Sequence, residues 1–177
     1  MKKIILVLLL ILSLHLFINT KQKQETVKIP DSAIRFRVLA NSNSPKDQKI
    51  KEQVRDKMQK KLYSVLKNSK SIDSAREIIN NNMTEFDNIV KEEMKDKEYS
   101  YKIDYGMHEF PKKVYKGVTY DAGYYESLLV TLGDGKGDNW WCVLFPPLCV
   151  LEAEEQNTSD VEYKSFVKEI IEKYFKF

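Results

Sequence analysis

Residues that commonly carry catalysis or bind metals are scarce in this chain. Its 177 residues include two histidines and two cysteines, and of the histidines only His108 lies beyond residue 20. A Ser-His-Asp or Cys-His arrangement therefore has one candidate base, and we expect His108 to lie on a surface loop. The spacing of Cys142 and Cys149 lacks the close pairing of a zinc half-site, and no second pair of ligands is present. We expect no catalytic residue, no metal site and no cofactor.

Long apolar runs are almost absent, and the exception is at the N-terminus. Residues 4–18 are uncharged and mostly apolar, and Lys2 and Lys3 precede them, which is the layout of a secretory signal. A helix over this run rises about 22 Å, less than the roughly 30 Å of a bilayer core, so export is favoured over a stable span. No small-residue cleavage site follows the run. Residues 1–20 are therefore predicted to be either a signal peptide or a retained N-terminal anchor.

The remaining chain lacks an excess of charge of either sign. Removal of residues 1–20 takes away Lys2 and Lys3 and leaves 27 basic residues against 26 acidic ones. Proteins that bind DNA or RNA usually present a one-sided basic field, so we expect no nucleic-acid partner. The length suits one domain with one core, which we place at residues 21–151. Residues 152–177 are expected to form an acidic linker and a C-terminal amphipathic helix.

Hydrophobic periodicity predicts a strand and two helices in the first half of the chain. Residues 33–40 alternate apolar side chains with Arg35 and Arg37, which indicates a strand with one buried face. Ser44 is a suitable N-cap for a helix over residues 45–66. Ser71 caps a second helix that is predicted to reach about residue 97, and a short connection makes the two helices antiparallel.

The second half is predicted to be mostly strands. Residues 99–105 alternate and are followed by Gly106, which is expected to end that strand. Strands over 125–132 and 140–145 flank a glycine-rich turn at 133–138, so we expect them to form a hairpin. The predicted fold class is α+β: an antiparallel-rich sheet of about four strands, two long antiparallel helices packed on one face, and a C-terminal helix. The first strand is expected to pair with late strands.

Residues 139–149 concentrate rare side chains. This stretch contains both tryptophans, both cysteines and two of the five prolines of the chain. A strand there must stop at Pro146 and Pro147, which lack the N–H that a ladder needs. Two interpretations of Cys142 and Cys149 remain open: a disulfide around the bend, or two free thiols that act as small buried apolar groups.

Two blocks of this sequence resemble the signatures of the stage II sporulation protein R family. The first is residues 34–48 (Ile-Arg-Phe-Arg-Val-Leu-Ala-Asn-Ser-Asn-Ser-Pro-Lys-Asp-Gln) with residues 51–56 (Lys-Glu-Gln-Val-Arg-Asp). The second comprises residues 122–126 (Ala-Gly-Tyr-Tyr-Glu) and residues 133–149, from Gly-Asp-Gly-Lys-Gly-Asp-Asn through Trp-Trp-Cys to Pro-Pro-Leu-Cys. The resemblance covers roughly residues 30–150. Asp121 stands where the family usually has proline, which affects the shape of one turn.

The resemblance implies a signalling protein of endospore formation. Such a protein is made in the forespore and exported into the space between the forespore and mother-cell membranes. There it triggers a membrane-bound aspartic protease of the mother cell, which processes the precursor of the sigma-E factor. A ligand for a receptor needs a presented surface rather than an active site. We therefore expect no enzymatic activity and no small-molecule substrate.

The two blocks also suggest a candidate partner-binding patch. Asn41, Ser42 and Asn43 leave the first strand, and residues 139–141 enter the last, so both groups are expected at one end of the sheet. The candidate residues are Asn41, Ser42, Asn43, Asn139, Trp140 and Trp141. In the competing interpretation Trp141 belongs to the core, Trp140 is a lid, and the asparagines serve turns and caps.

Two other functions remain open at this point. A secreted hydrolase of cell-wall material would need two carboxyl groups about 5 to 10 Å apart across a cleft. Its candidate acids are Asp104, Glu109, Asp121 and Glu126. A structural module of the cell envelope is the other alternative, and it predicts no effect on sigma-factor processing.

Overall fold

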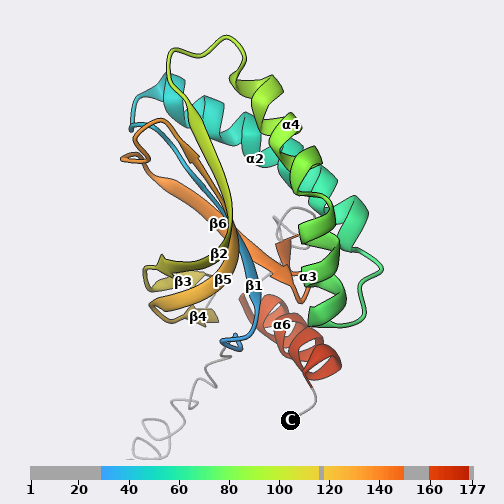
Figure 1. Ribbon diagram of the computed structural model, residues 1–177. Coiled ribbons are helices and arrows are strands. Elements are labelled where there is room, and N and C mark those ends of the chain that lie inside the picture. Colours follow the sequence, from blue (N-terminus) through green and yellow to red (C-terminus); the bar gives the residue numbers. More distant parts are fainter. Residues whose placement is uncertain (1–28, 116–117, 150–159, 176–177) are drawn as a thin grey trace, which may run out of the picture.

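A mixed four-stranded sheet organises the chain. The computed structural model describes residues 29–115, 118–149 and 160–175, and the predicted signal or anchor and the acidic linker lie outside them. Within the described part, the elements follow in the order β1 (Ile34–Leu39), α2 (Pro45–Leu66), α3 (Ile72–Asn81), α4 (Met83–Met94), β2 (Tyr101–Phe110), β3 (Lys113–Tyr115), β4 (Val118–Tyr120), β5 (Gly123–Leu132), β6 (Asn139–Phe145) and α6 (Asp160–Tyr174). The helices α2 to α4 line one side of the sheet (Figure 1). The α+β fold class is confirmed.

The order of the strands differs from the predicted hairpin. The sheet runs β2-β5-β1-β6, so β1 lies between the two strands that we expected to pair with each other. Phe36 of β1 faces Leu128 of the parallel strand β5 and Cys142 of the antiparallel strand β6. Both faces of β1 are buried, and a strand buried on both faces belongs in the centre of a sheet. The predicted pairing of the first strand with late strands is confirmed.

The first helix follows the prediction, and the second does not. The helix α2 has the predicted bounds, and the Ser44 side chain accepts a hydrogen bond from the Asp47 N–H at 3.1 Å. The predicted helix over residues 71–97 is two helices, α3 and α4, that meet at Asn82. The side-chain amide of Asn82 donates to the Ile78 carbonyl at 2.8 Å, so it competes with the backbone for the helical acceptor.

One strand end was predicted wrongly, and one short hairpin was not predicted. The strand β2 continues through Gly106 to Phe110, because an extended glycine with open space beside it can remain in a ladder. The short hairpin of β3 and β4 was not predicted, since strands of three residues show too little alternation. The predicted C-terminal helix is confirmed as α6.

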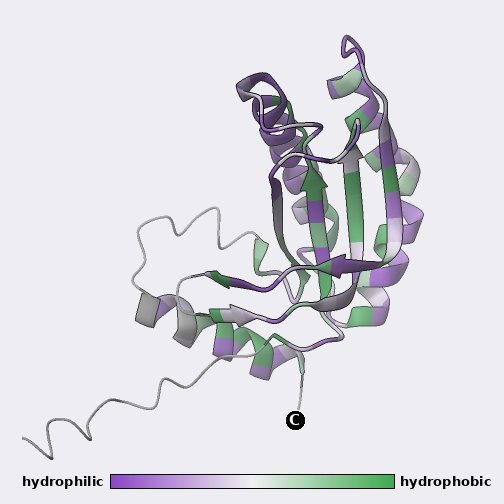
Figure 2. Cartoon of the chain, turned by 90° about the vertical axis from the view of Figure 1, so that its left-hand side faces the viewer, coloured by the Kyte–Doolittle hydropathy of each residue, from purple (hydrophilic) through white to green (hydrophobic). Residues whose placement is uncertain are grey.

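Apolar side chains form a cluster on each face of the sheet. The first cluster lies between the sheet and the helices α2 to α4. The second lies on the opposite face and combines side chains from strands and from α6, among them Tyr120, Trp141, Tyr163, Val167 and Ile171. Figure 2 looks onto this second face, with the β3–β4 hairpin and α6 gathered at the lower end of the sheet.

Arginine 35 was expected on a solvent-facing side of β1, and that expectation is wrong. Its side chain is fully buried, and its guanidinium carbon lies 3.4 Å from the ring centre of Tyr125 and 4.9 Å from that of Trp141. Aromatic faces stabilise such a cation, and the arginine stem adds apolar packing. Burial in this site lowers the pKa of Arg35.

Candidate functional site

The loop that follows β1 is organised by the carboxylate of Asp47. Asp47 is the third residue of α2, a position where an acid interacts favourably with the helix N-terminus. Its Oδ2 accepts hydrogen bonds from Asn41 Nδ2 at 2.9 Å and from Ser42 Oγ at 2.6 Å. Tyr99 donates its hydroxyl to Oδ1 at 2.9 Å. One buried acid thus joins the loop, the helix and the start of the β2 region.

These hydrogen bonds shift the pKa values of Asp47 and Tyr99. The hydrogen bond from Ser42, followed by that from Asn41, lowers the pKa of Asp47 because each bond favours the charged form. Burial and the neighbouring Asp47 carboxylate raise the pKa of Tyr99 to about 12. At neutral pH the carboxylate is therefore ionised, and the phenol keeps the proton that it donates.

The glycine-rich loop between β5 and β6 packs directly on this loop. Asn41 Oδ1 accepts a hydrogen bond from the Asp134 N–H at 3.0 Å, and Asn43 Oδ1 accepts one from the Asp138 N–H at 2.6 Å. The Gly137 N–H donates to the Ala40 carbonyl at 2.9 Å. A Cβ on Gly137 would lie 2.3 Å from the Ser42 carbonyl oxygen, so only glycine allows the two loops to approach so closely.

The structure gathers four of the six predicted partner-binding residues. Asn41, Ser42 and Asn43 lie at the same end of the sheet as Asn139, which faces Leu39 across the β1–β6 ladder. Asn43 is exposed, whereas Asn41 and Ser42 are half-buried and use their side chains in the hydrogen bonds described above. The polar side chains of Asn41 and Ser42 are therefore already used in hydrogen bonds within the protein.

The two tryptophans point to opposite faces of the sheet, because neighbouring residues of a strand alternate. Trp140 is half-buried and packs edge-on against Phe36, with ring centres 5.9 Å apart, while Arg55 lies over its ring at 5.6 Å. Trp141 is buried in the second cluster, 5.3 Å from Phe110 and 5.1 Å from Tyr120 between ring centres. They cannot both belong to one continuous patch with the asparagines.

Three residues on β2 and β5 form a hydrogen-bonded Ser-His-Asp chain. His108 Nδ1 lies 2.8 Å from Ser127 Oγ, and Nε2 lies 3.0 Å from Asp104 Oδ2. His108 is thus a strand residue with a mostly buried side chain, contrary to the surface loop expected from the sequence. Ser127 is fully buried, so a substrate carbonyl cannot reach its Oγ in this conformation. These hydrogen bonds satisfy the polar side chains of Asp104, His108 and Ser127 between the two strands.

The other carboxylates proposed for a hydrolase lie in different surroundings. Glu126 is partly buried, which raises its pKa, but hydrogen bonds from Arg76 and Tyr105 outweigh this effect and lower the pKa overall. Arg76 Nε lies 3.0 Å from both carboxylate oxygens. An acid held in its charged form is a poor proton donor. Glu109 is exposed on β2, and Asp121 follows β4.

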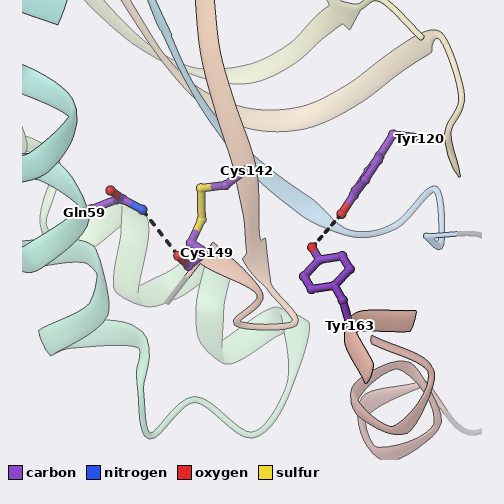
Figure 3. Close-up of a disulfide and its surroundings, with 5 residues drawn as sticks. All are labelled: Gln59, Tyr120, Cys142, Cys149 and Tyr163. Carbon is purple, nitrogen blue, oxygen red and sulfur yellow. Dashed lines mark hydrogen bonds between the residues drawn. A yellow bond between two sulfur atoms is a disulfide. The ribbon is translucent and has the colours of Figure 1, made fainter. Parts of the chain in front are cut away.

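The bend after β6 is held by a disulfide between Cys142 and Cys149, which lie seven residues apart (Figure 3). Gln59 of α2 donates to the Cys149 carbonyl at 3.3 Å and so attaches the bend to the helix. In the same view Tyr163 of α6 meets Tyr120, with hydroxyl oxygens 3.2 Å apart. The proline-rich bend is therefore anchored to its strand and to α2.

The described residues contain no group of three or more histidine, cysteine, aspartate or glutamate side chains that could hold a metal ion. Among residues 29–115, 118–149 and 160–175, no helix has the length and apolar character to cross a membrane.

Comparison with known proteins identifies the family. Residues 30–155 match the family model described as Stage II sporulation protein R. The chain belongs to the stage II sporulation protein R family. A protein named Stage II sporulation protein R from Bacillus subtilis (strain 168) is 46% identical over 138 residues, which are 76% of this chain and 62% of that protein. The chain thus spans less than two thirds of this relative's length. No solved structure matches it.

Family membership connects the chain to sporulation. The two sequence blocks that resemble the family correspond to identifiable parts of the fold. The matched residues contain β1 with its Asp47 loop as well as β6 with the disulfide bend. The sequence did not reveal that Asp47 joins the loop to the β2 region, because Tyr99, which makes that connection, lies 52 residues further along the chain. The burial of Arg35 was also missed, since alternation with apolar residues usually places an arginine in water.

Proposed function

We propose that the chain is the exported signal by which the forespore activates the membrane-bound aspartic protease of the mother cell. In this proposal it crosses the forespore membrane by means of residues 1–20 and works in the space between the two membranes. Binding to the protease then starts processing of the sigma-E precursor. The single observation that carries the proposal is the family match over residues 30–155, supported by 46% identity to the Bacillus subtilis protein.

The disulfide supports export. Cys142 and Cys149 are paired, and structural disulfides persist mainly in oxidising compartments outside the cytosol. A chain that folds after crossing the membrane can form this bond, whereas a cytosolic chain meets a reducing environment.

Activation by binding sets an energetic requirement. A ligand shifts an equilibrium between inactive and active protease only by its difference in affinity for the two states. A shift from about 1% to about 99% active protease needs roughly 10⁴-fold tighter binding to the active state. The chain must therefore present a surface that binds the active form of the protease much more tightly than the inactive form.

The test is deletion of the gene in the organism that makes the chain, followed by complementation. Sigma-E precursor and product are measured by immunoblot in sporulating cells. We expect the deletion to block precursor conversion, the intact chain to restore it, and a chain without residues 2–20 to fail. Normal conversion in the deletion strain would refute the proposal, and restoration by the variant without residues 2–20 would refute export as its basis.

A further inference from the structure

An apolar groove runs between the second half of α2 and the bend after β6. Its volume is roughly 280 Å³, slightly below the ~300 Å³ at which small-molecule pockets begin. The walls are apolar, and their residues come from both elements: Leu62, Leu66, Leu144, Pro147 and Cys149. This size suits one or two side chains of a partner protein better than a whole cofactor.

The walls of the groove are fixed before any partner arrives. Leu62, Leu66 and Leu144 are buried in the first cluster, so their positions are set by core packing. The disulfide and the hydrogen bond from Gln59 hold Cys149 against α2. A preformed site avoids most of the ordering cost of binding.

The rim of the groove carries two lysines and one acid. The acid, Asp56, is paired with Arg55 at 2.7 Å, whereas neither Lys60 nor Lys67 forms an ion pair with a described residue. The nearby Lys57 and Lys61 of α2, by contrast, are paired with glutamates of α4. Tyr63 also lies on the rim and is 45% exposed, so its ring is available to a partner. Apolar walls with two free cations complement an acidic segment that carries an apolar side chain.

We propose that this groove is the surface that binds the receptor, and that it takes an apolar side chain from an acidic segment of the mother-cell protease. The inference rests on the proposed function. The aromatic rim residue and the apolar walls provide the buried contact, and Lys60 and Lys67 select the acidic flanks. Interfaces commonly combine a desolvated apolar centre with a charged rim in this way.

Charge reversal tests the rim. The double variant Lys60→Glu with Lys67→Glu is compared with Lys49→Glu with Lys70→Glu, which changes the net charge equally at exposed lysines outside the groove. We expect the groove variant to reduce sigma-E precursor conversion at least tenfold and the control to stay within twofold of the unmodified chain. Thermal unfolding of both purified variants shows whether folding is retained.

Photo-cross-linking tests the occupant and does not depend on those variants. A benzoylphenylalanine replaces Tyr63 on the groove rim or, in a matched control, Tyr124, which is 68% exposed on β5. The probe is irradiated in sporulating cells, and the adduct is identified with antibodies against the protease. We expect the adduct from position 63 and none from position 124.

The outcomes separate this inference from the proposed function. If the unmodified chain restores precursor conversion and the groove variant does so equally well, the groove is not the receptor site although the signalling role stands. Cross-linking of position 63 within the chain or to a second copy would also overturn it. If the unmodified chain never affects conversion, the proposed function itself fails.

Discussion

At the scale of single residues, Asp47 and Arg35 show how two charged side chains can serve as core elements. Asp47 is almost completely buried, but three side-chain donors and the N-terminus of α2 satisfy it. Arg35 is buried among aromatic rings, and its Nε and Nη1 have no hydrogen-bond partner in the described part of the chain. The first residue should act through hydrogen bonding and the second through packing.

Replacement of Asp47 by asparagine should destabilise the protein in a pH-dependent manner. The folded state lowers the pKa of Asp47, so its contribution is present above the unfolded value of about 3.9 and is lost as pH falls through the folded value. We expect Asp47→Asn to lower the melting temperature by about 5 °C at pH 7, with the gap closing below pH ~4. Thermal unfolding followed by circular dichroism measures this, with the exposed Asp96→Asn as control. A gap that is constant with pH would contradict the assignment.

Arg35 should be replaceable by an apolar side chain of similar length. Arg35→Ala leaves a cavity among the rings and is expected to lower the free energy of unfolding by about 3 kcal/mol. Arg35→Met keeps contacts with the rings and removes a buried charge, so it should cost about half as much or less. Urea unfolding distinguishes them. Equal losses in both variants would show that the cation itself stabilises the site.

At the scale of elements, the two loops at the end of the sheet depend on each other. The loop after β1 supplies carbonyl and amide oxygens, and the loop before β6 supplies backbone N–H groups from Asp134, Gly137 and Asp138. Because these loops belong to strands that are neighbours only in the fold, each fixes the other. Sequence-local turn chemistry alone does not specify either conformation.

Two glycines should respond differently to the same substitution. Gly137→Ala places a methyl group against the Ser42 carbonyl, whereas Gly106→Ala meets no atom within 4 Å. We expect the first to lower the free energy of unfolding by roughly 2–3 kcal/mol and the second to change it by less than about 1 kcal/mol. Chemical unfolding of the two variants side by side measures the difference. Similar values would mean that the loops separate easily.

At the scale of the whole molecule, the second cluster depends on a helix outside the family match. The match ends at residue 155, whereas α6 begins at Asp160 and contributes Tyr163, Val167 and Ile171 to that cluster. Without α6, the side chains on that face, including Trp141, lose part of their cover. The C-terminal helix is therefore part of the folded unit.

A buried charge in α6 should reveal this dependence. Val167 is fully buried, and Val167→Asp is expected to lower the free energy of unfolding by about 3–5 kcal/mol, because an unpaired carboxylate would enter an apolar cluster. Ser165→Asp, on the exposed side of the same helix, should change it by less than about 0.5 kcal/mol. Urea unfolding monitored by tryptophan fluorescence gives both values. A harmless Val167→Asp would show that α6 is dispensable for stability.

Patterns within short segments were predicted well. The bounds of α2, its Ser44 cap and the existence of α6 follow from periodicities and caps that depend on neighbouring residues. The break at Asn82 and the passage of β2 through Gly106 were missed because both outcomes depend on a balance of a few kilocalories with tertiary contacts. Four of the six residues of the candidate patch lie together because strand ends bring the asparagines to one end of the sheet, whereas strand alternation separates Trp140 from Trp141.

The sequence by itself determined the family, the α+β class and the main helices, since these depend on local periodicity and on ordered blocks of residues. Tertiary structure alone decided that β1 lies between β5 and β6, that Arg35 is buried under aromatic rings, and that Asp47 joins three segments. The physical reason is that these features arise from contacts between residues dozens of positions apart. Such contacts cannot be predicted from the hydrophobic periodicity of a single sequence.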